Sequence, residues 1–209
     1  AGMGIGAAAT KGFQLVPKLG PKMASVLGYG AGEAVIASGS SGANVESEIG
    51  RMGHDELIKH PEYQAVYEKL GGEDSEEDRR AKSKKAIQDA ASGDSAALTA
   101  LSTFILSAPF GAVMGKATAG LPLASTRPRS IATGAAGEAG QEFFQSGAEQ
   151  LSQNYAINNY ADESKELSDG VLNSAVGGAA AGGLLGGTMG IGSPLEQPET
   201  KVKGSTPSA

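Results

Sequence analysis

Apolar residues recur along this chain at intervals of three and four, the spacing that places side chains on one face of an α-helix. The alternation of Val, Ile and Thr that is typical of strands never lasts more than a few residues. The pattern therefore predicts an all-α protein of loosely packed Gly/Ala-rich helices and helical hairpins, with a disordered tail. The clearest apolar faces comprise Tyr63, Val66, Tyr67 and Leu70, and then Phe144, Ala148, Leu151 and Tyr155.

Residues that start and stop helices divide this pattern. Pro61 suits a first helical turn, the glycine pair after Leu70 ends that helix, and Gly93 ends the charged helix that follows. The expected N-caps are Asp94, Ser130, and either Ser168 or Asp169. The expected helices cover 22–49, 55–70, 76–92, 95–115, 130–155, 162–167 and 170–192.

Composition changes along the chain and predicts four regions. Residues 1–50 form a helical segment rich in small residues, and 51–93 form amphipathic and charged helices. Residues 94–192 hold an apolar helix, a Glu/Gln-rich helix and a glycine-zipper helix. Residues 193–209 contain three prolines and mixed charges, which is typical of a flexible linker. In the second region acidic residues precede basic ones by about one helical turn, so most of these charges neutralise one another.

Two long stretches carry no charge. The first, Ser95–Gly115, has the length of a bilayer-spanning helix, but its Ser/Thr content and Pro109 favour a buried core helix over insertion. The second, Gly170–Leu195, has glycines at intervals of four, which let helices approach closely. Helix packing, membrane insertion and a loop all remain open for it. The candidate helix-packing or membrane-contacting residues are Gly111, Gly115, Gly178, Gly182, Gly183, Gly186 and Gly187.

The overall composition excludes several classes of function. Glycine accounts for 32 of 209 residues, Trp is absent and aromatic residues make up 5%. Such a chain favours close helix–helix contact over a thick core of large side chains. A net charge of −6 argues against a sequence-specific nucleic-acid surface. The absence of Cys excludes disulfides and thiolate metal sites.

Residues that could carry chemistry are few. His54 and His60 do not share a helix face, and no carboxylate spacing around them suggests a metal site. Glu138, Glu142 and Glu149 do share one, but no nucleophile accompanies them, and neighbouring glutamines favour an interhelical hydrogen-bonding face. The Gly111–Ala117 segment lacks the spacing and the Ser/Thr of a phosphate-binding loop. We therefore expect no catalytic residue, no cofactor and no metal.

One internal similarity stands out. The sequence GEAVIASGSSGANVESE (32–48) aligns without gaps with GEAGQEFFQSGAEQLSQ (137–153). Gly, Glu, Ala, Ser, Gly, Ala and Ser recur at matching positions. A duplicated helical unit and shared composition explain this similarity equally well.

Residues 137–187, GEAGQEFFQSGAEQLSQNYAINNYADESKELSDGVLNSAVGGAAAGGLLGG, resemble a region of very large internal virion (ejection) proteins of phages and prophages. HDELIKHPEYQAVYEKL (54–70) resembles a helix of the same proteins through Leu57, Pro61 and Tyr63. The resemblance implies a segment of a large multidomain polypeptide that is packed in the virion interior and expelled into the host envelope. It also implies a non-catalytic structural role in genome ejection, while a lytic transglycosylase domain can lie elsewhere in the parent chain.

The partners implied are other virion proteins, a self-oligomer and host membrane lipid. The alternative function is a soluble oligomerisation or docking module of a virion protein that makes no lipid contact. A pore-forming toxin with a glycine-rich hairpin shares the same physics. An enzyme, such as a peptidoglycan hydrolase fragment, is the least favoured class.

Overall fold

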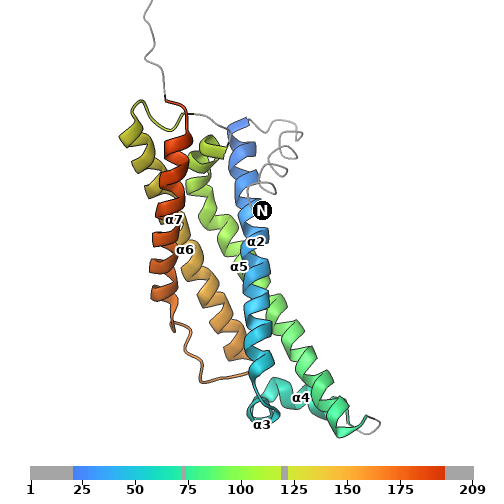
Figure 1. Cartoon of the computed structure of the whole chain (residues 1–209). Helices are drawn as coiled ribbons and strands as arrows, with labels where there is room; N and C mark the ends of the chain where they lie inside the picture. Colours follow the sequence, from blue (N-terminus) through green and yellow to red (C-terminus); the bar gives the residue numbers. More distant parts are fainter. Residues whose placement is uncertain (1–20, 72–73, 119–121, 196–209) are drawn as a thin grey trace, which may run out of the picture.

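The computed structural model describes residues 21–71, 74–118 and 122–195, and throughout these ranges the regular structure is α-helical. The predicted all-α class is confirmed. Two long antiparallel pairs dominate (Figure 1): α2 (Pro21–Arg51) packs against α5 (Glu76–Thr118), and α6 (Arg127–Tyr160) packs against α7 (Val171–Gly192). The short helices α3 (His54–Leu57) and α4 (Pro61–Lys69) lie where α2 ends and α5 begins.

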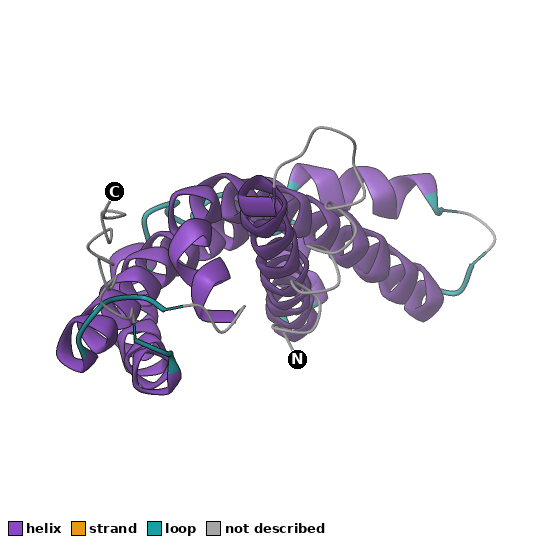
Figure 2. Cartoon of the chain, turned by 90° about the horizontal axis from the view of Figure 1, so that it is seen from above, coloured by secondary structure: helices purple, strands orange, loops and turns teal. Residues whose placement is uncertain are grey.

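The two hairpins lie beside each other in a bent row. Helix α7 packs on α6, and α6 packs in turn on α5 and, less extensively, on α2. Seen from above, the helices follow a curve and do not close around a common centre (Figure 2). Helix α6 is therefore the element through which the second hairpin is attached to the first.

The first hairpin corrects two of the expected helix boundaries. The predicted end at Gly93 is wrong, because α5 continues through Gly93 and Asp94 to Thr118. Packing on α2 outweighs the helix cost of one glycine, since Ala91 and Ser95 on either side are both fully buried. The expected single helix over 55–70 is split into α3 and α4, because Pro61 begins a new helix after the extended His60.

The second hairpin also starts and turns differently from expectation. Helix α6 begins at Arg127 after Thr126, so Ser130 is not its N-cap. The predicted helix over 162–167 is wrong, because this segment forms turns. Helix α7 is capped by Gly170, whose φ of 68° lies in the left-handed region that suits glycine, and not by Ser168 or Asp169. The described start of the expected linker, Ser193–Leu195, is not helical, and 196–209 lie outside the described residues.

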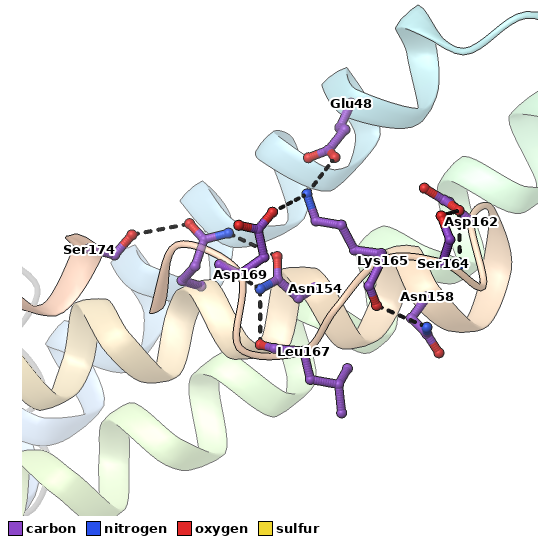
Figure 3. Close-up of polar contacts among 10 residues, drawn as sticks. Glu48, Asn154, Asn158, Asp162, Ser164, Lys165, Leu167, Asp169 and Ser174 are labelled. Atoms are coloured by element: carbon purple, nitrogen blue, oxygen red, sulfur yellow. Dashed lines mark hydrogen bonds and ion pairs between the residues drawn. The ribbon is translucent and has the colours of Figure 1, made fainter. Parts of the chain in front are cut away.

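The hairpin connection is held by side chains of α6 (Figure 3). Asn154 donates from Nδ2 to the carbonyls of Leu167 and Asp169, at 3.0 and 2.7 Å. One turn later, Asn158 donates to the carbonyls of Glu163 and Lys165. These four bonds tie the connection after α6 to that helix in its non-helical, turn-forming conformation.

The molecule divides into two regions with different interiors. The base, residues 45–71, 74–91 and 156–169, contains the hydrophobic core. This core consists of Val45, Ile49, Leu57, Tyr63, Tyr67, Ile87, Ala91, Ala156, Ile157 and Ala161. The shaft, residues 27–44, 92–110, 127–155 and 170–193, contains the rest of both hairpins. Among its described residues, the buried apolar side chains are all alanines: Ala34, Ala37 and Ala175.

The base is built like an ordinary water-soluble domain. The guanidinium of Arg79 lies 3.7 Å from the centre of the Tyr67 ring, and Tyr67 donates to Glu76. Glu76 forms ion pairs with Arg79 and Arg80 one turn later, as the charge pattern predicts. Lys84 donates to the carbonyls of Gly50 and Met52 and so satisfies the end of α2. Apolar groups lie inside the base and charges lie outside.

Candidate functional site: an apolar surface over a polar interior

The contact between α6 and α7 is formed largely by backbone. A Cβ added at Gly182 would lie 2.7 Å from the Glu138 carbonyl oxygen, and one at Gly178 would lie 2.6 Å from that of Glu142. At Gly186 it would overlap the carbonyl of Gly134. No side chain fits at such separations, so the predicted glycine face is a real helix contact and these positions require glycine.

The other predicted packing glycines have different surroundings. A Cβ at Gly183 or Gly187 would reach Ala139 or Ala135 at ordinary van der Waals distances, so these two positions lie at the edge of the contact. The surroundings of Gly111 and Gly115 lie outside what the structure describes. The prediction missed Gly190, whose added Cβ would lie 2.5 Å from the Ser130 carbonyl oxygen. The sequence did contain a signal for Gly190, which lies four residues after Gly186 and so continues the same spacing.

Arg127 closes the glycine contact at its end. Its Nη1 donates to the carbonyls of Gly190, Ile191 and Ser193, which are left without helical partners where α7 ends. Ser130 also donates to the Gly190 carbonyl, at 2.9 Å. The sequence did not reveal this role, because Arg127 lies more than sixty residues from the carbonyls it binds.

Hydroxyl groups form the contact between α2 and α5 within the shaft. Four fully buried Ser and Thr side chains recur at every fourth residue of α5: Ser95, Thr99, Thr103 and Ser107. Thr99 donates to Ser41 of α2 at 2.9 Å, and Ser41 and Ser95 lie 2.6 Å apart, Oγ to Oγ. The sequence favoured a buried helix over residues 95–115, and among the side chains described in this segment the fully buried ones are those of its Ser/Thr face. The spacing of four was visible in the sequence and would have identified the inward side.

Large apolar side chains lie on the outside of the shaft. On α7, 76% of Leu184 is exposed, and on α6, 50% of Phe144 is exposed. The predicted apolar face of Phe144, Leu151 and Tyr155 is therefore turned outward. The exposed set in the shaft comprises Val35, Ile36, Leu98, Leu101, Phe104, Ile105, Phe144, Leu151, Tyr155, Leu172, Val176, Leu184, Leu185 and Ile191. We call this set the apolar surface.

The opposite side of α6 is polar and buried. Gln141 is fully buried, and 7% of Gln145 is exposed. Both lie in the protein interior with Glu138, but the Oε1 atom of Gln145 is buried without a hydrogen-bond partner, so the expected interhelical hydrogen-bonding face stays a prediction. In this helix the usual distribution is reversed, since glutamates and glutamines are inside and Phe and Leu are outside.

Three carboxylates of α6 are held in this interior. Burial is the main cause that raises the pKa of Glu138 to about 7, with further contributions from the charges of Glu142 and Glu33. Burial also raises the pKa of Glu142 and of Glu149. Glu149 accepts a hydrogen bond from Ser40 of α2 at 2.7 Å.

The two histidines serve the base. His60 is the N-cap of α4, and its Nδ1 accepts a hydrogen bond from the Glu62 amide at 3.3 Å. His54 Nδ1 lies 2.9 Å from the Tyr63 hydroxyl. In the part of the chain that the structure describes, no three metal-ligating side chains gather at one point.

The internal similarity has a structural counterpart. The aligned segments lie on α2 and α6, the first helix of each hairpin. Their matched glycines Gly42 and Gly147 each face the second helix of their own hairpin. An added Cβ would lie 3.5 Å from that of Ala96 in α5 and 3.4 Å from that of Ala175 in α7, respectively. This agreement favours the duplication of a helical hairpin over shared composition alone.

Comparisons of the chain with protein-family models, with curated proteins and with solved structures give no match. Of the helices described, none is both long and apolar enough to cross a membrane.

Proposed function

We propose that this chain is a non-catalytic structural segment of a phage internal or ejection protein. In this role it packs helices and contacts host membrane lipid during DNA delivery. The observation that supports the proposal is the reversed shaft, in which large apolar side chains surround an interior of glycine, hydroxyl and carboxamide groups. The resemblance of 54–70 and 137–187 to such proteins supports the setting.

The physical reason lies in what drives helix packing in each solvent. In water, burial of apolar side chains is the dominant favourable term, at about 25 cal/mol per Å². Against lipid that term disappears, because the acyl chains are as apolar as leucine. Helices then associate through small residues and interhelical hydrogen bonds. The glycine contact of α6 with α7 and the Ser41–Thr99 bond are contacts of this second kind.

The base supports a complementary role in the same proposal. It has a closed apolar core and exposed ion pairs, such as Lys85 with Glu46 and with Asp89. A segment with such a base keeps one end in water while the apolar surface contacts lipid. This division suits a protein that is carried in a virion and later meets a bilayer.

A second candidate is a soluble oligomerisation or docking module in which other protein chains cover the apolar surface. The buried carboxylates favour it. Glu138, Glu142 and Glu149 are costly to keep near hydrocarbon, and a protein partner would leave them in a more polar setting. In this case the apolar surface meets a second copy or a neighbouring virion protein.

Flotation with liposomes of phosphatidylethanolamine and phosphatidylglycerol tests the first candidate. We expect the wild-type chain to float with the vesicles. A double variant, L184S/L185S, should lose at least half of this binding, because both side chains are exposed and their removal leaves the core intact. L167S is the control, since 45% of Leu167 is exposed but this residue belongs to the base.

Analytical ultracentrifugation of the same proteins separates the two candidates. In the flotation assay, a wild-type chain that stays in the aqueous fraction would contradict lipid contact. An oligomer in plain buffer that L184S/L185S dissociates and L167S preserves would establish the second candidate instead.

A further inference from the structure

The two hairpins match each other in their second helices as well as in their first. The matched glycines Gly42 and Gly147 each face an alanine of the second helix, and an added Cβ would also approach one carbonyl oxygen there. That oxygen belongs to Ser92 of α5, at 3.1 Å, and to Val171 of α7, at 3.9 Å. Each of these two residues lies four positions before the alanine of its own helix. Helix α5 thus matches α7 at one constant offset.

This offset also aligns the inner faces of the two second helices. The buried hydroxyl row of α5, which contacts α2, falls on α7 residues that contact α6. Ser95, Thr99, Thr103 and Ser107 match Ser174, Gly178, Gly182 and Gly186, respectively. Both rows consist of small residues at intervals of four. The second hairpin therefore repeats the first, both in chain order and in the face that its second helix turns inward.

The contact between the hairpins joins one side of α5 to one side of α6. Tyr160 of α6 donates to Asp94 of α5 at 2.7 Å. A Cβ added at Gly140 of α6 would lie 3.0 Å from the Phe110 ring of α5. Asp94 and Phe110 belong to one row of α5 that runs beside the hydroxyl row at the same interval of four. We call it the contact row, and it consists of Asp94, Leu98, Ser102, Leu106 and Phe110.

The side of α7 that matches the contact row is open. Its residues are Asn173, Gly177, Ala181, Leu185 and Met189, and the first four of them are exposed. The exposed fraction of Leu185 is 56%, and a Cβ added at Gly177 would meet no atom within 4 Å. Helix α7 therefore presents the same side that α5 uses to hold α6.

The matching side of α2 is open too. Gly140, which meets Phe110, corresponds to Val35, and 57% of Val35 is exposed. Gln141 and Ser152 of α6 are buried, whereas the matching residues of α2, Ile36 and Ser47, are exposed. Helix α2 thus leaves open a side that is covered on α6. The two free sides are the two halves of the contact that joins the hairpins within one chain.

We propose that copies of this chain associate head-to-tail, with α7 of one copy packed on α2 of the next as α5 packs on α6 within the chain. Because the two sides differ, the contact is heterologous and each copy uses both of its free sides. Repeat proteins stay separate when their end repeats have a polar outer face, but here Val35, Ile36 and Leu185 make both free sides apolar. The inference rests on the second candidate function, to which it adds a second copy as the partner and the two sides in contact.

The absence of Cys allows this contact to be tested by disulfide cross-linking of the full chain. The contact of Gly140 with Phe110 corresponds to a contact of Val35 with Met189 of another copy. Two single variants, V35C and M189C, are therefore mixed and oxidised. We expect a disulfide-linked dimer from the mixture and none from either variant alone. The control mixture replaces M189C by L184C, because Leu184 is exposed on α7 but lies outside the matching row.

Sedimentation equilibrium of two charge variants provides the second test. Leu185→Glu should weaken the association by about tenfold or more, because it places an unpaired charge in the contact. Leu184→Glu, at the next residue, should change the association by less than about twofold, since its side chain lies outside the contact.

Three results would overturn the head-to-tail contact. Equal cross-linking of V35C with M189C and with L184C would show that the copies meet without a fixed register. An oligomer that gives no link between V35C and M189C and that Leu185→Glu leaves intact would reject this contact while keeping the second candidate function. A wild-type chain that stays monomeric at about 100 μM would reject both.

Discussion

The base and the shaft share helices but bury opposite kinds of side chain. In the base, Ile49, Leu57 and Tyr63 are enclosed and the charged groups lie outside. In the shaft, Thr99 and Gln141 are enclosed, and Leu184 lies outside. Helices α2, α5 and α6 run through both regions, so the difference does not come from the helices themselves. We propose that it comes from the surroundings each region is suited to, namely water for the base and an apolar partner for the shaft.

The largest expected effect is a loss of stability when a core side chain of the base is truncated. Ile157→Ala should lower the free energy of unfolding by about 2–5 kcal/mol, because it leaves a cavity in a fully packed core. Leu184→Ala, the same kind of truncation in the shaft, should change it by less than about 0.5 kcal/mol in plain buffer. Urea denaturation followed by circular dichroism measures both. Equal losses would show that the two regions are built alike.

The next effect concerns the glycine contact of the shaft. Gly186→Ala should cost about 1–3 kcal/mol or more, because its Cβ overlaps the Gly134 backbone and forces α6 and α7 apart. Gly177→Ala is the matched control on the same helix. Its Cβ points into open space, so it should stabilise the helix by about 0.5–1 kcal/mol. Thermal unfolding that ranks these two variants in the reverse order would refute the close contact.

A smaller effect depends on pH. Folding raises the pKa of Glu138 from 4.5 to about 7, so the folded state holds more protons between these values. The free energy of unfolding should therefore fall as the pH rises through this window, by about 1–3 kcal/mol at most. E138Q should lack this part of the decline and exceed wild type in stability above pH 7, with no difference below 4.5. Urea titrations across this range give the comparison, and parallel curves for the two proteins would count against it.

The smallest effect tests the hydroxyl row. Thr99→Val removes the donor to Ser41 and should cost about 0.5–1.5 kcal/mol. Thr103→Val, one turn along the same row, should be neutral or stabilising, because the Thr103 hydroxyl is buried without a partner. Differential scanning calorimetry resolves the pair. A larger loss for Thr103→Val would mean that the row is organised differently.

Local patterns in the sequence were sufficient to predict the helices and one contact. The spacing of Gly178, Gly182 and Gly186 identifies the face of α7 that meets α6, because a helical repeat is a short-range property. The prediction that Gly93 ends a helix was wrong because it depends on long-range contacts. Whether a helix continues through a glycine depends on the packing on either side, and Ala91 and Ser95 pack on a helix about fifty residues away.

The direction in which each face points was not predictable from one helix alone. The faces of α6 that hold Phe144 and Gln145 are both well defined, and a water-soluble protein would bury the first. The structure buries the second and exposes the first. The loop over 161–170 and the role of Arg127 depend likewise on contacts between distant residues.

A single spin label on the apolar surface tests the central claim most directly. Leu184→Cys is labelled in the otherwise Cys-free chain, and its accessibility to oxygen and to a water-soluble nickel complex is measured with and without liposomes. Leu167→Cys in the base serves as the reference. We expect liposomes to make the Leu184 site accessible to oxygen and to shield it from nickel, while the Leu167 site stays accessible to nickel. A Leu184 site that remains equally open to nickel in liposomes would contradict lipid contact by the shaft.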